Sequence, residues 1–172
     1  KLEEIGDVTF YGNKMVKVHI PSVKTIGIGA FWNNEITDVK CDNVERLKDS
    51  AFINNKLTQV TPNEFPKLKY VEYGAFNGNT TIKVIDLPSV ITLEQAFKNI
   101  DCEVKDNFQN LEVLGASALS YKNITELNMP KIKEINNGAF LGNPGVDDTK
   151  YEGKFAGSVI IWTNQNDVPS RE

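Results

Sequence analysis

A two-residue motif recurs along the chain at an almost constant interval, and this repetition constrains the fold more than any other feature. The motif is a small residue followed by a large apolar one, with successive separations of 21, 21, 24, 21, 22 and 21 residues. A period of roughly 20 to 50 residues is the signature of solenoids and related repeat architectures. The sequence therefore predicts about seven copies of one small unit, anchored at Thr9-Phe10, Ala30-Phe31, Ala51-Phe52, Ala75-Phe76, Ala96-Phe97, Ala118-Leu119 and Ala139-Phe140.

The residues that follow each anchor alternate in polarity. In the second copy, the apolar residues Val39 and Cys41 are separated by the polar Lys40, and Ile36 lies three residues earlier. Similar apolar positions recur in the other copies, as at Val18 and Ile20. A period of two is typical of a half-buried β-strand. Each copy is therefore expected to contribute one short strand.

The second half of each copy has a different spacing. Apolar pairs three residues apart, such as Val23 and Ile26, suit a bend or turn, and residues 26–31 suit a short helical or 3₁₀ turn that faces the core. The short period excludes long helices. A residue that tolerates positive φ follows most anchors, and Tyr121 is the exception in a series of Gly12, Asn33, Asn54, Gly78, Asn99 and Gly142.

An asparagine stands next in the sequence in several copies. Stacked copies of this residue could form a ladder that bonds to the backbone of the turns. The series consists of Asn13, Asn34, Asn55, Asn79 and Asn143.

One coil of this kind cannot cover its own apolar face, so neighbouring coils must stack around a shared core. The sequence predicts an α/β solenoid over residues 1–145. Residues 146–172 are expected to form a cap and tail of the same domain, with a capping strand that ends at Trp162. Three irregularities are expected to distort the coils: an insertion at 65–67, a shift at 79–81, and Lys105 in the fifth copy, where an apolar residue is expected.

The repeat unit resembles that of the BspA-like leucine-rich repeat family, a family of bacterial surface antigens. Residues 26–39 (IGIGAFWNNEITDV), 51–60 (AFINNKLTQV) and 127–130 (LNMP) carry the likeness, which covers roughly residues 5 to 145. The resemblance implies a right-handed coil of the leucine-rich repeat type. It also implies an extracellular or cell-surface protein that acts in adhesion or recognition, and it transfers no catalytic residue.

Composition and charge narrow the classes of partner. The chain has 172 residues, 40% of them hydrophobic, and a net charge of −4. This balance gives no basic surface for a nucleic acid or an anionic membrane. No apolar run approaches the roughly 20 residues that a membrane-spanning helix needs. The first residues lack the apolar centre of a signal peptide, although such a signal could have been removed from a mature chain.

The chain offers little that could carry catalysis. His19 is the only histidine, and no nucleophile elbow, zinc-protease motif or glycine-rich phosphate loop is present. We therefore expect no enzyme activity, no cofactor and no metal site. Cys41 and Cys102 fall on inward positions three coils apart, where stacked strands would hold them roughly 14 Å from each other. They are expected to be buried free thiols.

The outward residues of the predicted strands form the candidate binding surface, because the fold does not need them for packing. A recognition module that binds a protein, or alternatively a glycan, through this face is the first hypothesis. A structural spacer with an inert face is the second. A binding face should carry contiguous apolar or aromatic residues. The residues predicted from the strand pattern are Lys17, His19, Asp38, Lys40, Gln59, Thr61, Asp86, Glu126 and Asn128, with Glu103 and Lys105 in the irregular fifth copy.

Overall fold

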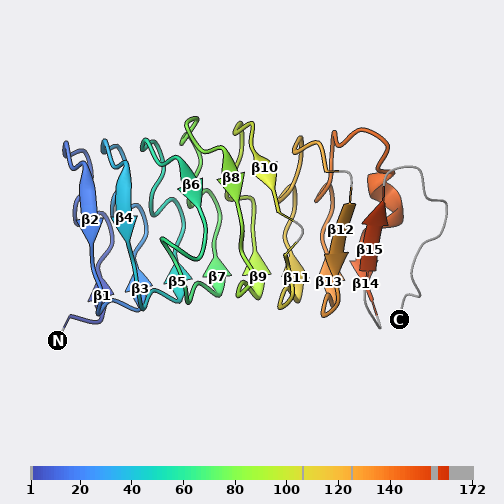
Figure 1. Ribbon diagram of the computed structural model, residues 1–172, viewed down its shortest axis with the longest axis horizontal. Coiled ribbons are helices and arrows are strands. Elements are labelled where there is room, and N and C mark those ends of the chain that lie inside the picture. Colours follow the sequence, from blue (N-terminus) through green and yellow to red (C-terminus); the bar gives the residue numbers. More distant parts are fainter. Residues whose placement is uncertain (1, 106, 125, 156–158, 163–172) are drawn as a thin grey trace.

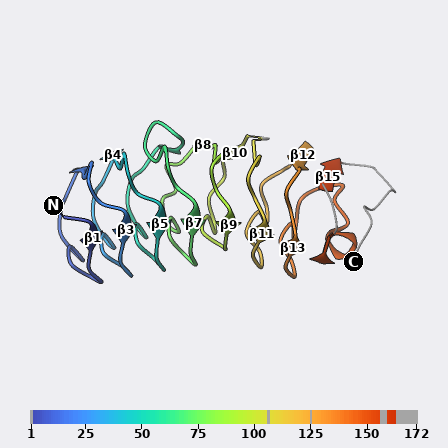
Figure 2. The ribbon, with the colours of Figure 1, turned by 90° about the horizontal axis from the view of Figure 1, so that it is seen from below.

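The chain winds into an elongated β-solenoid of about six turns (Figures 1 and 2). The computed structural model describes residues 2–105, 107–124, 126–155 and 159–162, and of 159–162 only the backbone. Seven anchors delimit these six turns, so the count of seven copies is one more than the number of complete turns. Within the predicted cap and tail of residues 146–172, residues 156–158 and 163–172 lie outside the described residues.

One sheet runs along the whole solenoid at the lower side of Figure 1. Seven two-residue strands pair in parallel, one per coil, and an eighth strand closes the C-terminal end in the antiparallel direction. The strands are β1 (Glu4–Ile5), β3 (Thr25–Ile26), β5 (Arg46–Leu47), β7 (Tyr70–Val71), β9 (Thr92–Leu93), β11 (Val113–Leu114), β13 (Glu134–Ile135) and the antiparallel β14 (Gly153–Lys154).

The strands predicted after the anchors are also present, but they form three separate small sheets. The first consists of β2 (Lys17–His19) and β4 (Asp38–Lys40), and the second of β6 (Gln59–Val60), β8 (Val84–Ile85) and β10 (Glu103–Val104). The third pairs β12 (Glu126–Met129) antiparallel with β15 (Val159–Trp162), so a strand does lie at the position predicted for the cap.

The prediction of an α/β fold with a helical turn in each copy is wrong. Among the described residues, the one helix is a 3₁₀ turn at Asp148–Lys150. The apolar pairs taken for a turn lead into the strands of the long sheet, as Val23 leads into β3. Their backbone groups bond to the neighbouring coil: Lys24 donates its N–H to the Glu3 carbonyl at 2.8 Å. Bonds between coils satisfy these groups, so no helical bond within the segment is needed.

Left-handed residues explain why the segment before each anchor does not continue as a helix. Gly29 has a φ of 57° and Asn33 one of 55°, so two residues of a single turn interrupt any helical run. The N–H groups of Gly29, Phe31 and Asn33 instead donate to the next coil, at the carbonyls of residues 49, 51 and 53. The turns themselves therefore form a ladder of backbone hydrogen bonds along the solenoid.

The positive φ predicted after the anchors is confirmed at all six Gly and Asn positions. Tyr121, the exception in the series, adopts a φ of 55° as well. The second left-handed position lies directly before the two-residue anchor, and the sequence analysis missed it. Glycine or serine occupies this position in most coils, at Gly29, Ser50, Gly74, Ser117 and Gly138, whereas the first coil has Val8.

Replacing Val8 by glycine is expected to stabilise the protein by about 0.5–1 kcal/mol. Val8 is 57% exposed and has a φ of 48°, a conformation that costs a β-branched residue more than it costs glycine. The greater freedom of glycine in the unfolded chain offsets part of the gain. Urea unfolding measures the difference. Val16, which is exposed and has no positive φ, is the matched control, and Val16→Gly should destabilise.

The core is a column of stacked side chains inside the coils. The rings of Phe10, Phe31, Phe52, Phe76 and Phe97 stack nearly parallel, with centroid separations between 5.1 and 6.0 Å. Leu119 occupies the same position in the next coil and ends the column of rings. Repetition of the anchor thus buries one large apolar side chain per coil against both of its neighbours.

The predicted asparagine ladder is confirmed for the buried members of the series. Asn79 donates its Nδ2 to the carbonyls of Phe52 and Phe76, each at 2.8 Å, and its Oδ1 accepts the N–H of Leu57 at 3.2 Å. Phe52 and Leu57 belong to the preceding coil, so one amide ties two coils together. Asn34, Asn55 and Asn143 make equivalent bonds.

The irregularity predicted in the third coil is present, but it lies at residues 61–64 and not at 65–67. It separates the sheet of β2 and β4 from the sheet of β6, β8 and β10. Residues 61–64 form an extra turn before Phe65, whose buried ring packs edge-on against Phe52 and Phe76. Across this turn, the N–H of Cys41 donates to the carbonyl of Glu64 at 2.9 Å. The extra turn therefore takes up a donor that a continuous sheet would need between β4 and β6. In the fifth coil, Val104 pairs with Ile85, and Lys105 is exposed.

Candidate functional site

The predicted binding face does not form one surface. Its nine residues lie on, or directly after, strands of three separate sheets, because β4 does not pair with β6 and, among the described residues, β10 does not pair with β12. Only the part on β2 and β4 matches the arrangement expected from the sequence. In these two strands Lys17 lies opposite Asp38, and His19 lies opposite Lys40.

Asp38 is the centre of the β2–β4 part. Its carboxylate lies 3.3 Å from both the Lys17 ammonium and the His19 ring. Hydrogen bonds from His19 and Lys17 hold the pKa of Asp38 below its ordinary value. All three side chains are largely exposed, so this cluster is a solvated ion pair of small energetic weight.

The remaining predicted residues contact groups of their own coil, of the next coil or of the cap. Gln59 and Thr61 both donate to the carboxylate of Glu64, at 2.7 and 2.8 Å. Asp86 accepts a hydrogen bond from Asn107 in the next coil at 3.0 Å. On β12, Glu126 and Asn128 lie beside the antiparallel β15. These side chains therefore support local structure more than they form an open platform.

The long sheet presents a second exposed face, which sequence reasoning missed because its strands were interpreted as turns. Each strand buries its second residue and points its first residue outward. The sequence offered one signal for this face. The residue directly before each buried Ile, Leu or Val varies from coil to coil, as expected for a position that points outward. In register from coil to coil, the outward residues are Glu4, Thr25, Arg46, Tyr70, Thr92, Val113 and Glu134.

A second row, rich in charge, runs beside the first. A backbone hydrogen bond joins each residue of this row to the next, so the residues lie side by side from coil to coil. Ion pairs between adjacent coils join Glu3 to Lys24 at 3.0 Å, Glu45 to Lys69 at 2.9 Å and Glu112 to Lys133 at 2.8 Å. Negative and positive side chains alternate along this row, and one apolar residue interrupts the alternation. The row consists of Glu3, Lys24, Glu45, Lys69, Ile91, Glu112 and Lys133.

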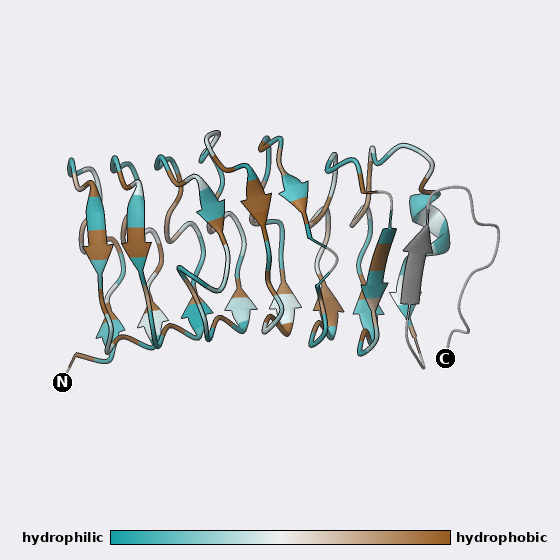
Figure 3. Cartoon of the chain, in the orientation of Figure 1, coloured by the Kyte–Doolittle hydropathy of each residue, from teal (hydrophilic) through white to brown (hydrophobic). Residues whose placement is uncertain are grey.

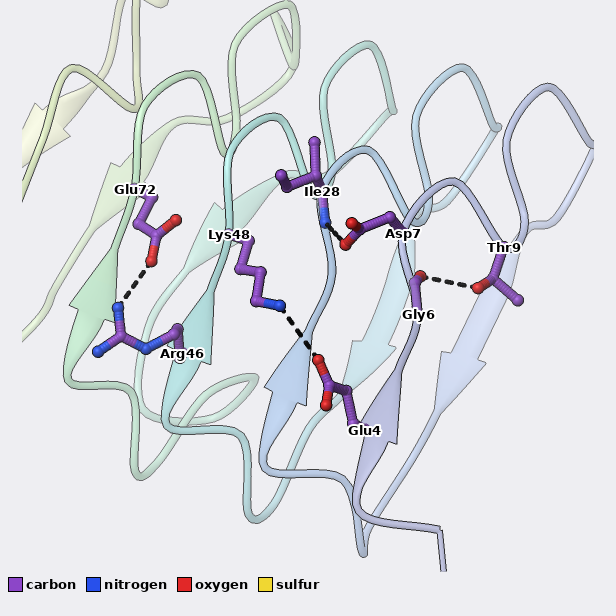
Figure 4. A network of polar contacts seen from close by, with 8 residues as sticks. All are labelled: Glu4, Gly6, Asp7, Thr9, Ile28, Arg46, Lys48 and Glu72. Atoms are coloured by element: carbon purple, nitrogen blue, oxygen red, sulfur yellow. Dashed lines mark hydrogen bonds and ion pairs between the residues drawn. The ribbon is translucent and has the colours of Figure 1, made fainter.

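Charges also pair across the N-terminal half of this face (Figure 4). Lys48 reaches Glu4 at 3.1 Å, two coils away, and Arg46 reaches Glu72 at 2.7 Å. The Arg46 guanidinium also lies 4.2 Å from the centre of the Tyr70 ring, in a cation–π contact. Arg46 is thereby held in one orientation on the sheet.

The centre of the long sheet is the least charged part of this face. Tyr70, Ile91, Thr92 and Val113 lie on or immediately before three adjacent strands, and all four are partly exposed. In Figure 3, β11 has a hydrophobic colour along its length, as expected for a strand of Val and Leu. We call Tyr70, Ile91, Thr92 and Val113 the central patch. It has the contiguous apolar and aromatic character that was absent from the face predicted by sequence.

Comparison with known protein families identifies the repeat. Residues 3–106 and 42–147 match the model of the BspA type leucine rich repeat region, which is present in six copies. The chain belongs to the BspA-type leucine-rich repeat family. The family resemblance inferred from the repeat unit is thereby confirmed. No curated protein and no solved structure matches the chain.

BspA-type membership suggests a protein-interaction module, since leucine-rich repeat domains are typically binding or scaffold modules without enzyme activity. Cys41 and Cys102 are free and buried, and burial raises the pKa of both thiols. In the part of the chain that the structure describes, no group of three or more His, Cys, Asp and Glu side chains could hold a metal ion. No helix among those residues is long and apolar enough to cross a membrane.

One carboxylate on the BspA-type sheet is destabilising. Burial, together with the charges of Asp49, Glu72 and Glu134, raises the pKa of Glu94. The folded state therefore favours the protonated form, so the stability that Glu94 contributes is present at acid pH and is lost as the pH rises through its folded pKa.

Glu94→Gln is therefore expected to raise the free energy of unfolding at pH 7. The gain should be a few tenths of a kcal/mol, because solvent screens this half-exposed group. Urea titrations of both proteins at pH values from about 3 to about 8 measure this gain in the free energy of unfolding. The difference should shrink as the pH falls through the raised pKa of Glu94, and it should be absent below pH 4.5, the ordinary pKa of a glutamate. A gain that is constant across this range would show that repulsion and burial of the charge are not its cause.

Proposed function

We propose that this BspA-type solenoid is a recognition module of a secreted or cell-surface protein, and that it binds a protein ligand through the outward face of the long sheet. The observation that carries the proposal is the central patch. It joins apolar and aromatic side chains on three adjacent strands, within a surface whose other outward positions are mostly polar or charged.

The chemistry of the patch and its border favours a protein as the ligand. Tyrosine and arginine are enriched among the residues that dominate binding energy at protein interfaces, and Tyr70 and Arg46 are held against each other here. Paired charges of both signs border the apolar centre, which suits the polar rim of a protein interface. Hydrogen bonds between coils keep the strands rigid, so little order has to be imposed on binding.

The surface location and the adhesive role are part of the same proposal. They follow from the resemblance of the repeat to those of bacterial surface antigens. Host or extracellular-matrix proteins would be the ligands. The face on β2 and β4, with Lys17, His19, Asp38 and Lys40, is a second candidate surface, and a glycan is the alternative ligand.

An array of immobilised matrix proteins and mucins tests the proposal with three forms of the chain. The first is the wild type, and the second carries Tyr70→Ser and Ile91→Ser. The third carries Lys17→Ala, Asp38→Ala and Lys40→Ala and is the matched control on the other face. Circular dichroism checks that each form is folded. The proposal expects binding by the wild type and the third form, and a loss of at least about tenfold in the second, as for hot-spot truncation.

The other outcomes assign the function differently. Loss of binding only in the third form would move the site to β2 and β4. Absence of binding by the wild type to every protein on the array would favour a spacer domain. The ion pairs that already join the charges of neighbouring coils are the observation that supports an inert face.

A further inference from the structure

The ladder of asparagines is interrupted at two consecutive coils. Ile100 and Lys122 stand at the positions that Asn79 and Asn143 occupy in the coils on either side. Ile100 has no side-chain hydrogen-bonding group. The Lys122 ammonium donates to the carbonyls of Phe97 at 2.9 Å and Ile100 at 2.7 Å, so a cation replaces the neutral amide of the ladder.

The backbone ladder between the turns is interrupted at the same place. Gln95 stands where other coils have a small left-handed residue, and it has no positive φ. The N–H of Lys98 bonds to the side chain of Asn77 in the coil before, at 2.7 Å. Both turns are described throughout, and no backbone hydrogen bond joins residues 95–99 to residues 116–120. The anchor turns of the fifth and sixth coils are thus not joined by backbone hydrogen bonds as the other anchor turns are, although β9 and β11 of the same coils remain paired.

A cleft of about 640 Å³ opens between these turns. Its volume lies within the range of small-ligand pockets. Leu141 and Tyr121, which is 65% exposed, supply most of the apolar surface, and the buried Ile100 lies behind them. The polar groups that line the cleft are amides and hydroxyls, such as those of Gln95, Asn123 and Ser117, together with Lys98, Lys122 and the carboxylate of Asp101.

Two positive groups in the cleft have donor capacity to spare. An ammonium has three N–H donors, and Lys122 uses two of them on carbonyls. Lys98 is exposed, and its ammonium makes no ion pair or hydrogen bond with the described residues. Against these two cations the cleft has one carboxylate, Asp101. The lining therefore has a net positive charge, although the whole chain has a net charge of −4.

We propose that this cleft binds a hexuronic acid residue, the carboxylated sugar unit of acidic polysaccharides. Amides and hydroxyls that both donate and accept match the vicinal hydroxyls of a pyranose ring. Tyr121 offers an exposed aromatic face to the ring, and the Lys98 ammonium pairs with the sugar carboxylate. The cleft shares no residue with the central patch, so this site stands or falls independently of the protein-binding face.

Titration of the ¹⁵N-labelled chain with glucuronic acid, followed by amide chemical shifts, tests the site. Glucose is the matched neutral sugar, and acetate and inorganic phosphate are the anions without a sugar ring. We expect saturable shifts confined to residues 95–101, 117–123 and 141–142 with glucuronic acid. A dissociation constant on the order of 1 mM is expected for one sugar residue. Glucose should bind at least about tenfold more weakly.

Two variants test whether glucuronic acid binds in the cleft or is attracted nonspecifically by exposed charges. Lys98→Met should weaken glucuronic acid binding about tenfold, the loss of one charge-assisted hydrogen bond, whereas the exposed Lys14→Met should leave it unchanged. The double variant Ile100→Asn and Lys122→Asn restores the ladder, and it should close the cleft and abolish the shifts. Unfolding experiments check that each variant is folded.

Three results would overturn the proposal. One is the absence of saturable shifts with glucuronic acid up to about 50 mM, well above the expected dissociation constant. Another is equal binding of acetate or phosphate, which would show an anion site without sugar recognition. The last is undiminished binding of glucuronic acid both by the Lys98→Met variant and by the Ile100→Asn and Lys122→Asn double variant.

Discussion

Replacing Asn79 by alanine is expected to lower the free energy of unfolding by about 3–5 kcal/mol, since the buried Leu57 N–H would lose its partner and two buried carbonyls would each lose one of their two hydrogen bonds. Asn79 is fully buried, and its amide serves the carbonyls of Phe52 and Phe76 and the N–H of Leu57. Each of these groups would remain out of reach of water. Chemical denaturation followed by circular dichroism measures the loss.

Asn13 provides a matched control for this prediction. It stands three residues after its anchor, as Asn79 does, but it is exposed, and its Nδ2 makes one long bond of 3.4 Å to the Tyr11 carbonyl. Asn13→Ala should cost less than about 0.5 kcal/mol, as for an ordinary surface substitution. Equal losses at Asn13 and Asn79 would mean that the asparagines act through local turn propensity and that the bonds between coils are unimportant.

Phe52→Ala is expected to cost about 3–5 kcal/mol as well, here by opening a cavity in the column of rings. The Phe52 ring is fully buried and stacks on Phe31 at 5.1 Å and on Phe76 at 6.0 Å, with Phe65 edge-on at 5.9 Å. Its removal would deprive two coil interfaces of contacts at once. The midpoint of thermal unfolding should fall together with the free energy of unfolding.

Leucine at the same position separates the loss of volume from the loss of the ring. Leu119 occupies the anchor position of the sixth coil and is fully buried, so the fold accepts this side chain. Phe52→Leu should therefore cost only about 1–2 kcal/mol. A cost equal to that of alanine would indicate that stacking of the rings, and not filling of the core, stabilises the column.

The repeat made the stacked coils, the strands that follow the anchors and the left-handed residue after each anchor predictable. Each of these features depends on residues close in sequence, and Gly12 or Asn33 takes a positive φ for local steric reasons. The long sheet was not predictable in the same way. A strand of two residues, such as Thr25–Ile26, is too short to show alternation, and the spacing of Val23 and Ile26 also fits a turn.

The candidate site was predictable only in part. The outward direction of Lys17, His19, Asp38 and Lys40 followed from the strand pattern. The division of that face did not, because it depends on where the extra turn at residues 61–64 places the Glu64 carbonyl. The central patch was missed because Tyr70, Ile91 and Val113 lie 21 or 22 residues apart and become neighbours only when coils stack.

The sequence by itself determined the coiled architecture and its period, the anchors of the core and the left-handed turns, since these depend on the size, polarity and backbone freedom of single residues. Only the tertiary structure decided which strands join into a continuous sheet, which outward side chains become neighbours, and where the ladder opens at Ile100 and Lys122. The physical reason is that each coil leaves hydrogen-bonding groups unsatisfied, and the coil stacked against it determines which of them find a partner.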